Sequence, residues 1–388
     1  MLLRDYLNEF ELDWAQAAAR SEQIPPGKIK KKKLLLIGSQ NLLQRAIALS
    51  FLAWNDSAKA GILAQSAVAE AGALMPDQVW SEEEFPPSKA DYIIFTGYCC
   101  QEMTLSVGET ARFLTQFKEQ VRLACASSCQ KMLLLSDGRV YGKTGYGFAA
   151  SEYESGKTDT AKAGFEAQYL LGAMEHIFVT EARKQNKNFV ILRSALLYGA
   201  GIPAMNHAAL QLSALCAAGK EFSVALSRKK SSYISIHDLL TAIQYVLTVC
   251  PDNKIFNVAG PDSVASKGEI AMKLYQNFPD LCKLSMSTRT DGEPVTEETI
   301  DGIWLNTQLL EHYGFIPTVS LEDGLIILVK YLQNTGEAFI FDNTYMGKLE
   351  KVQQILLAYL LEIDRICKKH DIKYFPAGGT LLGAIRHH

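Results

Sequence analysis

Short apolar runs alternate with helical patterns along the first 200 residues of the chain. Residues 34–37 are wholly apolar, Gly38 follows them, and a helical pattern spans 42–54. Strand-type runs and helical patterns then alternate, at residues 61–64, 91–96, 111–126, 132–136, 167–184 and 189–193. Apolar runs of this length are typical of strands buried on both faces. Strands that alternate with helices predict an α/β fold with a Rossmann-like, doubly wound parallel sheet.

Past residue 200 the pattern becomes mixed, which predicts a small α/β C-terminal substrate lobe, mainly within 200–320. Its expected helices and strands are 208–218, 233–236, 239–249, 254–258, 266–277 and 321–333. We expect Asp238 to cap the helix at 239–249. The remaining segments are a helical extension (1–29), a polar linker (336–346) and an incomplete helix-strand appendage (347–388), which leaves one large domain over 30–335.

Composition narrows the functional classes. Apolar residues make up 48% and charged residues 21% of the 388 positions, which is globular composition. The net charge of −3 argues against a nucleic-acid partner. No apolar run approaches the roughly 18 residues of a membrane span, and the acidic N-terminus is unlike a signal peptide. The eight cysteines form no C-x-x-C pair, so we expect reduced thiols in a cytoplasmic protein.

Several motifs in the large domain occur in a familiar order. Residues 136–142 read S-D-G-R-V-Y-G, which is similar to an S-[ST]-x-x-V-Y-G segment. The other matching segments are residues 34–38, 91–98, 191–193, 197–199, 233–238 and 255–258. Together they resemble the extended short-chain dehydrogenase/reductase family, the NAD-dependent nucleotide-sugar epimerases and dehydratases. The resemblance covers about 30–335 and implies that family's fold.

The resemblance also implies a dinucleotide held by a G-x-x-G-x-x-G turn, in which glycine lets the backbone approach the pyrophosphate. Residues 38–44 read G-S-Q-N-L-L-Q, so only the first glycine is kept, and Gln44 brings a side chain to the helix–sheet contact. The second strand ends in A-Q-S, without a carboxylate for the ribose. The candidate cofactor-binding residues are Gly38, Gln40, Asn41, Leu42, Gly97 and Ser136. NAD(P) stays a possible cofactor, and the missing glycines weigh against it.

In that family a Ser or Thr orients the sugar hydroxyl, a Tyr acts as general base, and a Lys four residues later lowers the pKa of the Tyr. The V-Y-G anchor places the Ser/Thr position on Asp137. The helix pattern Y-x-x-x-K-x-x-x-E has its counterpart at Ala167, Leu171 and Glu175, counted from Arg193, so both the Tyr and the Lys are replaced. Moving the register to Tyr169 puts Ala173 at the Lys position and restores nothing.

One literal Y-x-x-x-K exists, at Tyr153 and Lys157. With 16 tyrosines in the chain, about one such match is expected by chance. The weak catalytic candidates are therefore Asp137, Tyr153 and Lys157, and the candidate substrate-binding residues are Arg193, Arg228 and Tyr233. In the family a basic residue near Arg228 meets the nucleotide-sugar diphosphate, and a solvated loop is the alternative.

The last 42 residues resemble another family. A helical pattern over 348–370 and a strand-type run at 372–375 lead into G-G-T-L-L-G-A-I-R-H at 378–387. This segment looks like the opening of the LicD family, which transfers phosphocholine or similar groups to glycans. That family's metal-binding aspartates follow this point, so we expect no metal site in this chain and interpret 347–388 as a truncated, covalently fused LicD-like segment.

The leading hypothesis is a degenerate epimerase/dehydratase-like domain that acts as a binding or scaffolding module for a LicD-type transferase in surface-glycan synthesis. The alternative is an active NAD(P)-dependent nucleotide-sugar epimerase, dehydratase or reductase with a divergent site. A third hypothesis gives the domain only a role in oligomerisation. By analogy with the family, the helices at 111–126 and 167–184 are the candidates for a homodimer interface.

Overall fold

The structure is a computed structural model of the 388-residue chain. It describes residues 21–29, 32–38, 42–55, 62–64, 90–97, 106–142, 149–154, 166–201, 207–225, 229–287 and 302–335. The chain divides into two units, Met1–Ala338 and Phe339–His388. The LicD-like segment and residues 1–20 of the expected helical extension (1–29) lie outside the described residues.

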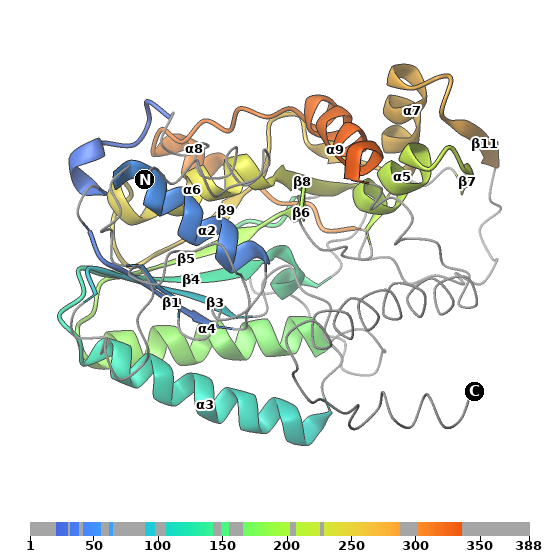
Figure 1. Cartoon of the computed structure of the whole chain (residues 1–388). Helices are drawn as coiled ribbons and strands as arrows, with labels where there is room; N and C mark the ends of the chain where they lie inside the picture. The colour runs from blue at the N-terminus through green and yellow to red at the C-terminus, as the bar shows by residue number, and fades with distance from the viewer. Residues whose placement is uncertain are drawn as a thin grey trace, which may run out of the picture. The chain divides into compact units, whose positions relative to one another are not determined.

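A six-stranded parallel sheet forms the centre of this unit, in the order β2-β1-β3-β4-β5-β9 (Figure 1). Its strands are β1 (Leu34–Gly38), β2 (Ile62–Ala64), β3 (Tyr92–Gly97), β4 (Lys131–Asp137), β5 (Phe189–Ser194) and β9 (Lys254–Val258). Every neighbouring pair runs parallel, and Leu36 lies beside both Ala64 and Ile94. The sheet confirms the predicted Rossmann-like fold.

Helices cover both faces of the sheet, which is why β3, β4 and β5 are buried along their whole length. Helices α2 (Leu42–Leu52) and α6 (Ile236–Thr248) lie on one face, and α3 (Val107–Cys125) and α4 (Glu166–Lys184) on the other (Figure 1). Under α3 and α4, the ring of Phe95 meets those of Phe117 and Phe178 edge-on, each at 5.6 Å between centroids.

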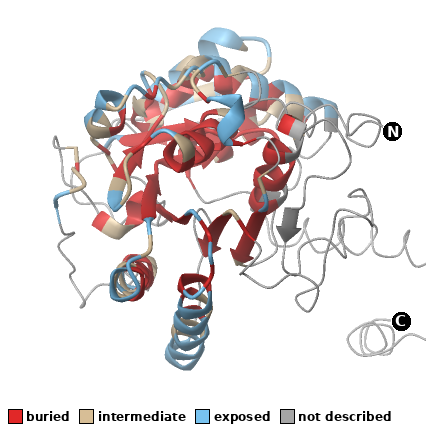
Figure 2. Cartoon of the chain, turned by 90° about the vertical axis from the view of Figure 1, so that its left-hand side faces the viewer, coloured by how far each residue is buried: buried red, intermediate tan, exposed pale blue. Residues whose placement is uncertain are grey.

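Helix α3 begins four residues before its predicted start because Ser106 caps it. The hydroxyl of Ser106 accepts a hydrogen bond from the Glu109 amide, and the Glu109 carboxylate accepts one from the Ser106 amide at 2.8 Å. This reciprocal capping box satisfies two backbone donors at the helix start. Much of α3 is exposed on its outer side (Figure 2).

The C-terminal lobe has a three-stranded sheet, β10-β8-β6, and a two-stranded sheet, β11-β7. Its strands are β6 (Leu196–Tyr198), β7 (Glu221–Ala225), β8 (Ser231–Ser235), β10 (Val264–Ala265) and β11 (Lys283–Ser287). Its helices are α5 (Ala208–Ala217), α7 (Lys267–Asn277), α8 (Gln308–His312) and α9 (Leu321–Thr335). The lobe is small and mixed, as predicted. No helix in the part of the chain described here is long and apolar enough to cross a membrane.

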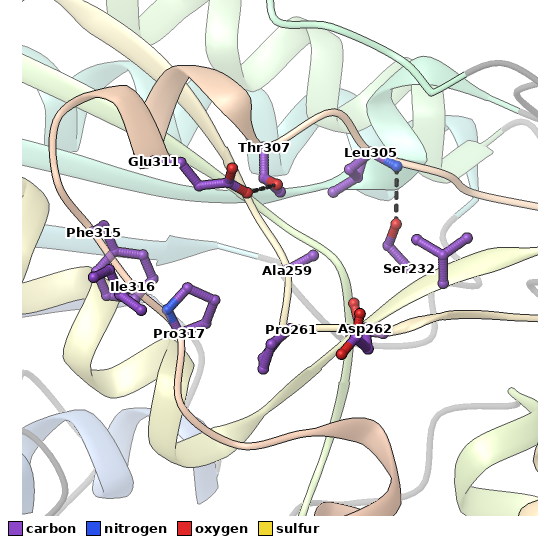
Figure 3. A pocket seen from close by; sticks show the side chains of 13 residues that line it. Ser232, Ala259, Pro261, Asp262, Leu305, Thr307, Glu311, Phe315, Ile316 and Pro317 are labelled. Atoms are coloured by element: carbon purple, nitrogen blue, oxygen red, sulfur yellow. Dashed lines mark hydrogen bonds between the residues drawn. The ribbon is translucent and has the colours of Figure 1, made fainter.

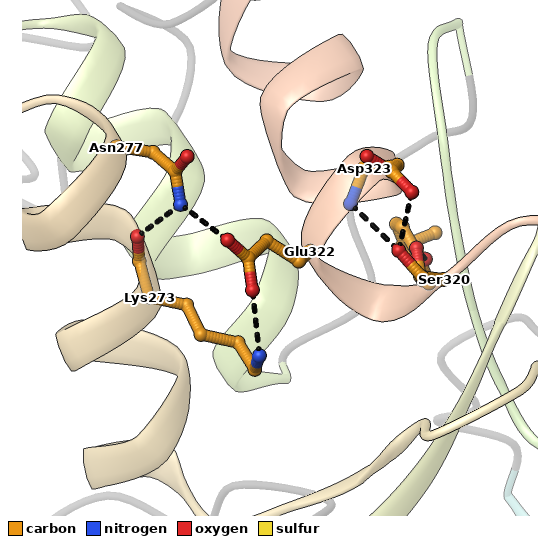
Figure 4. A network of polar contacts seen from close by, with 6 residues as sticks. Lys273, Asn277, Ser320, Glu322 and Asp323 are labelled. Carbon is orange, nitrogen blue, oxygen red and sulfur yellow. Dashed lines mark hydrogen bonds and ion pairs between the residues drawn. The ribbon is translucent and has the colours of Figure 1, made fainter.

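Helix α9 closes the lobe through polar contacts with α7 (Figure 4). The Glu322 carboxylate accepts hydrogen bonds from the Lys273 ammonium at 2.9 Å and from the Asn277 amide at 3.1 Å. Ser320 caps α9 by accepting a hydrogen bond from the Asp323 amide at 3.1 Å. These contacts hold α9 against α7 at the end of the C-terminal lobe.

The prediction that Asp238 caps the helix at 239–249 is wrong. Helix α6 begins at Ile236, three residues earlier, and Ser235 caps it by accepting from the Asp238 amide at 3.1 Å. The Asp238 carboxylate instead accepts three hydrogen bonds, from the amide and hydroxyl of Thr318 and from the amide of Val319. Asp238 therefore joins α6 to the segment that leads into α9.

Candidate functional site

The carboxyl ends of β1, β3 and β4 meet at one edge of the parallel sheet, where doubly wound folds bind their ligands. Gly38 ends β1 and pairs with Gly97 at the end of β3, and both have positive φ, +151° and +48°. Ser136, the last residue but one of β4, is buried. Three of the candidate cofactor-binding residues thus lie at this edge. Gln40 and Asn41 lie outside the described residues, and Leu42 is described only as the start of α2.

Gln44 fills the space beneath the expected glycine turn. Its side chain is 1% exposed, and its amide donates to the Thr96 hydroxyl at 2.8 Å. A Cβ atom at Gly38 would lie 2.3 Å from that hydroxyl and 3.1 Å from the Gln44 amide nitrogen, so glycine is required there. Helix α2 therefore packs against the sheet through a buried polar side chain at the position where the family pattern has glycine.

A buried ion pair fixes the register of α4 against the sheet. The Arg193 guanidinium on β5 donates to both carboxylate oxygens of Glu175, at 3.0 and 2.6 Å. Glu175 is the last member of the expected helix pattern Y-x-x-x-K-x-x-x-E, in which Ala167 and Leu171 are the counterparts of the Tyr and the Lys. Leu171 is 1% exposed. These positions therefore offer neither a phenol nor an ammonium group.

Asp137, at the position of the catalytic Ser or Thr, is tied to Arg139. Its carboxylate caps the 3₁₀ turn at Gly138–Tyr141 by accepting from the Arg139 amide at 2.9 Å. It also accepts from the Arg139 guanidinium at 2.8 and 2.6 Å, and both side chains are buried. An ionised carboxylate only accepts hydrogen bonds, so Asp137 in this state does not donate a proton as a catalytic hydroxyl does.

A buried polar network continues from Arg193 across the carboxyl ends of β4, β5 and β9. Arg193 donates to the Tyr141 hydroxyl at 2.7 Å, and that hydroxyl donates to the Asn257 side-chain oxygen at 2.8 Å. The backbone amide of Asn257 donates to the Glu152 carboxylate at 2.8 Å. Burial raises the pKa of both Tyr141 and Glu152, and the charge of Arg193 opposes both shifts. Perturbed pKa values of this kind cluster at functional sites.

Sequence reasoning missed the connection between these residues. Tyr141 and Asn257 belong to matched motifs, but their contact joins positions 116 apart in the chain. No motif contains Glu152. Only the hydrogen bonds of Asn257 to Glu152 and to the Ala150 carbonyl reveal it.

The other candidates lie apart from this network or outside the described residues. Tyr153 is 83% exposed. Tyr233 is buried in β8, where its ring lies 5.8 Å from that of His207. Lys157 and Arg228 lie outside the described residues. Among the residues that are described, no group of three or more His, Cys, Asp or Glu side chains could hold a metal ion.

A separate pocket of about 700 Å³ lies between the loop after β9 and α8 (Figure 3). It is lined by Ser232, Ala259, Gly260, Pro261, Asp262, Ser263, Val264, Leu305, Thr307, Glu311, Phe315, Ile316 and Pro317. The Glu311 carboxylate accepts from the Thr307 hydroxyl at 2.5 Å. The lining contains two carboxylates and no Lys, Arg or His side chain. Phosphate groups are bound by cationic donors, so this lining does not suit a nucleotide diphosphate.

The sheet order, the two covering layers and the mixed lobe define a Rossmann-type α/β protein with the fold of the extended short-chain dehydrogenase/reductases. No family model and no curated protein matches the sequence. Solved structures do match. The UDP-glucose 4-epimerase of Thermotoga maritima with UDP-glucose is 15% identical, with a TM-score of 0.59 over 79% of this chain and all of that one.

Two further structures match over a similar part of the chain. The UDP-glucuronic acid 4-epimerase of Bacillus cereus, in complex with UDP-glucuronic acid and NAD, is 16% identical, with a TM-score of 0.59 over 78% of this chain and 99% of its own. The dTDP-glucose 4,6-dehydratase of Bacillus anthracis, in complex with NAD, is 11% identical, with a TM-score of 0.59 over 79% of this chain and 98% of its own. At these identities the likeness shows the fold.

Proposed function

We propose that this chain is a degenerate nucleotide-sugar epimerase/dehydratase-like domain that binds a nucleotide sugar or acts as a scaffold, and does not transfer hydride. Its partner would be the covalently fused LicD-type transferase, in surface-glycan synthesis. The observation that carries the proposal is the register of α4. Glu175 contacts Arg193 in a bidentate ion pair, which leaves Ala167 and Leu171 where a catalytic Tyr and Lys would stand.

The chemistry of these positions supports the proposal. Oxidation of a sugar hydroxyl needs a general base within hydrogen-bond reach and a cation that lowers the pKa of that base. Alanine and leucine supply neither group, and Asp137 is paired with Arg139. Gln44 adds a second disagreement, because its buried side chain stands where a glycine would let α2 pack closely below the pyrophosphate. These described residues support the proposal that the chain does not use NAD(P) as a hydride carrier.

Nucleotide-sugar binding is the part of the family's function that the proposal keeps. The solved neighbours contain UDP-sugars as well as NAD, so the fold accommodates the sugar ligand. The buried network around Arg193 joins the carboxyl ends of β4, β5 and β9 by hydrogen bonds within the chain, so this edge of the sheet does not depend on a bound dinucleotide. The acidic pocket beside α8 is not assigned to the diphosphate, because its lining has no cation.

Calorimetry on the purified chain tests the proposal. We expect no binding of NAD⁺ or NADP⁺ at up to millimolar concentration, and measurable binding of at least one of UDP-glucose, UDP-glucuronic acid and dTDP-glucose. The Bacillus cereus epimerase, whose structure contains NAD and UDP-glucuronic acid, is the matched positive control. Tight dinucleotide binding would refute the degenerate site. Absence of all binding would reduce the proposal to scaffolding or oligomerisation.

The alternative is an active enzyme with a divergent site. It is favoured by the position of Tyr153, which follows Glu152 in a segment bonded to the end of β9. In that case Tyr153→Phe and Lys157→Met would abolish turnover of a nucleotide sugar with NAD(P), whereas Tyr169→Phe, an exposed tyrosine on α4, would not. If no variant and no wild-type chain shows turnover, the alternative is excluded.

The homodimer remains part of the proposal. Helices α3 and α4 have the predicted bounds within a few residues, and α3 exposes Val107 and Leu123. Light scattering on the purified chain measures the mass. Charged substitution of Leu123 is expected to lower that mass to the monomer value if α3 forms the interface.

A further inference from the structure

Two buried cysteines from different parts of the C-terminal lobe are in direct contact. The Sγ atoms of Cys216 and Cys282 lie 2.8 Å apart, although the residues are 66 positions apart in the chain. Cys216 is in the last turn of α5, and Cys282 immediately precedes β11. Their side chains are 0% and 4% exposed. Sequence spacing gave no sign of this pair, because neither residue belongs to a short cysteine motif.

We propose that Cys216 and Cys282 are a site of reversible oxidation that forms an intramolecular disulfide. A disulfide places its sulfur atoms about 2.05 Å apart and requires both Cβ–Sγ bonds to converge. The Sγ contact shows that the two sulfur atoms already meet in the folded chain. Bond formation therefore needs the sulfur atoms to close by less than about 1 Å, which rotation of the side chains can supply.

The reaction balances with a small peroxide as the oxidant. One thiolate attacks the O–O bond of hydrogen peroxide, which gives a sulfenic acid and, after protonation of the leaving hydroxide, one water molecule. The second sulfur then attacks the sulfenic sulfur, loses its proton and releases a second water molecule. Two thiols and one peroxide thus become one disulfide and two waters, with the sulfurs oxidised by two electrons and the peroxide reduced.

Access and reactivity set the rate of this step. Cys282 follows an exposed turn at 279–280, so local opening of the turn can admit a small oxidant. Burial raises the pKa of both thiols, and only the thiolate is the nucleophile. We therefore expect slow oxidation at neutral pH and faster oxidation as the pH rises.

The cross-link would stabilise the outer part of the lobe. Strands β7 and β11 form a sheet of only two strands, in which Lys283 pairs with Glu221. Two-stranded sheets are marginal without support from packing. A covalent bond between α5 and the start of β11 would hold this pair against the helix, and it would restrict the unfolded chain as well.

Peptide mapping of the whole chain tests the proposal. The chain is treated with hydrogen peroxide, unfolded, alkylated and digested, and the expected product is a peptide pair joined through Cys216 and Cys282, two hydrogens lighter than the free thiols. Oxidised wild type should melt roughly 5–10 °C above its reduced form. Cys216→Ser should abolish both effects. Cys125→Ser, at a buried cysteine elsewhere in the fold, should retain them.

Two outcomes would overturn the inference. The first is recovery of both thiols in alkylated form after peroxide treatment. The second is a mixture of links in which other cysteines of the chain take part as often as this pair. Should Cys216→Ser not fold, Cys282→Ser and the wild-type mapping decide the question.

Discussion

The ion pair between Glu175 and Arg193 offers the sharpest test of the structure, because the functional argument depends on the register it fixes. Glu175→Gln keeps the side-chain volume and removes the negative charge that faces the buried guanidinium. Both side chains are less than a tenth exposed, and the contact has two charge-assisted hydrogen bonds. Removing one partner of such a pair costs about 3–5 kcal/mol, because the other charge stays buried. We expect about 3 kcal/mol for the isosteric change.

Urea and thermal unfolding of the whole chain measure this loss. For a domain of about 305 residues, 3 kcal/mol corresponds to a fall in melting temperature of roughly 5 °C. The matched control is Glu119→Gln, in the exposed pair with Arg122, for which a loss of about 0–1 kcal/mol is expected. Replacing both partners, with Glu175→Leu and Arg193→Met, should recover most of the stability. A loss for Glu175→Gln no larger than that of the control would refute the buried contact and the register of α4.

Three further predictions concern other residues of the first unit. Leu171→Lys buries an ammonium group and should cost about 2–5 kcal/mol without any gain of dinucleotide binding by calorimetry; a stable variant that binds NAD⁺ would contradict the proposed function. Asp238→Ala removes the acceptor of three hydrogen bonds from residues 318–319 and should lower the free energy of unfolding in urea by about 2–3 kcal/mol. The capping change Ser235→Ala should lower it by about 1 kcal/mol. Equal losses would contradict the role of Asp238 in joining α6 to residues 318–319. Burial raises the pKa of Glu152, so protonation of this carboxyl stabilises the folded chain at low pH, and that stabilisation is lost as the pH rises through the raised pKa. Glu152→Gln should remove this dependence of the unfolding midpoint on pH. An unchanged dependence would assign it to another group.

Local pattern predicted the sheet well because each strand carries its own signal. The runs at 34–37 and 132–135 are wholly apolar, and the strands found there are buried on both faces. The start of α3 was predicted too late, although Ser106 and Glu109 form the S-x-x-E signature of a capping box. The start of a helix depends on a single polar capping residue, whereas the spacing of apolar residues indicates only the middle of the helix.

Contacts between distant positions were beyond the reach of local pattern. Asp238 precedes an apolar helical run, which predicts a helix cap. Its carboxylate instead accepts hydrogen bonds from residues about 80 positions later in the chain. Tyr141 and Asn257 each lie in a recognisable motif, and only the strand order β4-β5-β9 brings them together. The same holds for Cys216 and Cys282, whose contact is set by how α5 packs near β11.

Two positions independently support the proposal that this chain keeps the fold without hydride transfer. Gln44 is buried and bonded to Thr96, so a glycine there would remove a hydrogen bond and leave a cavity. Leu171 is packed into the core, so a lysine there would be an unpaired buried charge. The surrounding structure thus accommodates Gln44 and Leu171 at both positions where the family pattern has Gly and Lys. Under the proposed function, we expect the single substitutions Gln44→Gly and Leu171→Lys each to destabilise the chain without restoring hydride transfer.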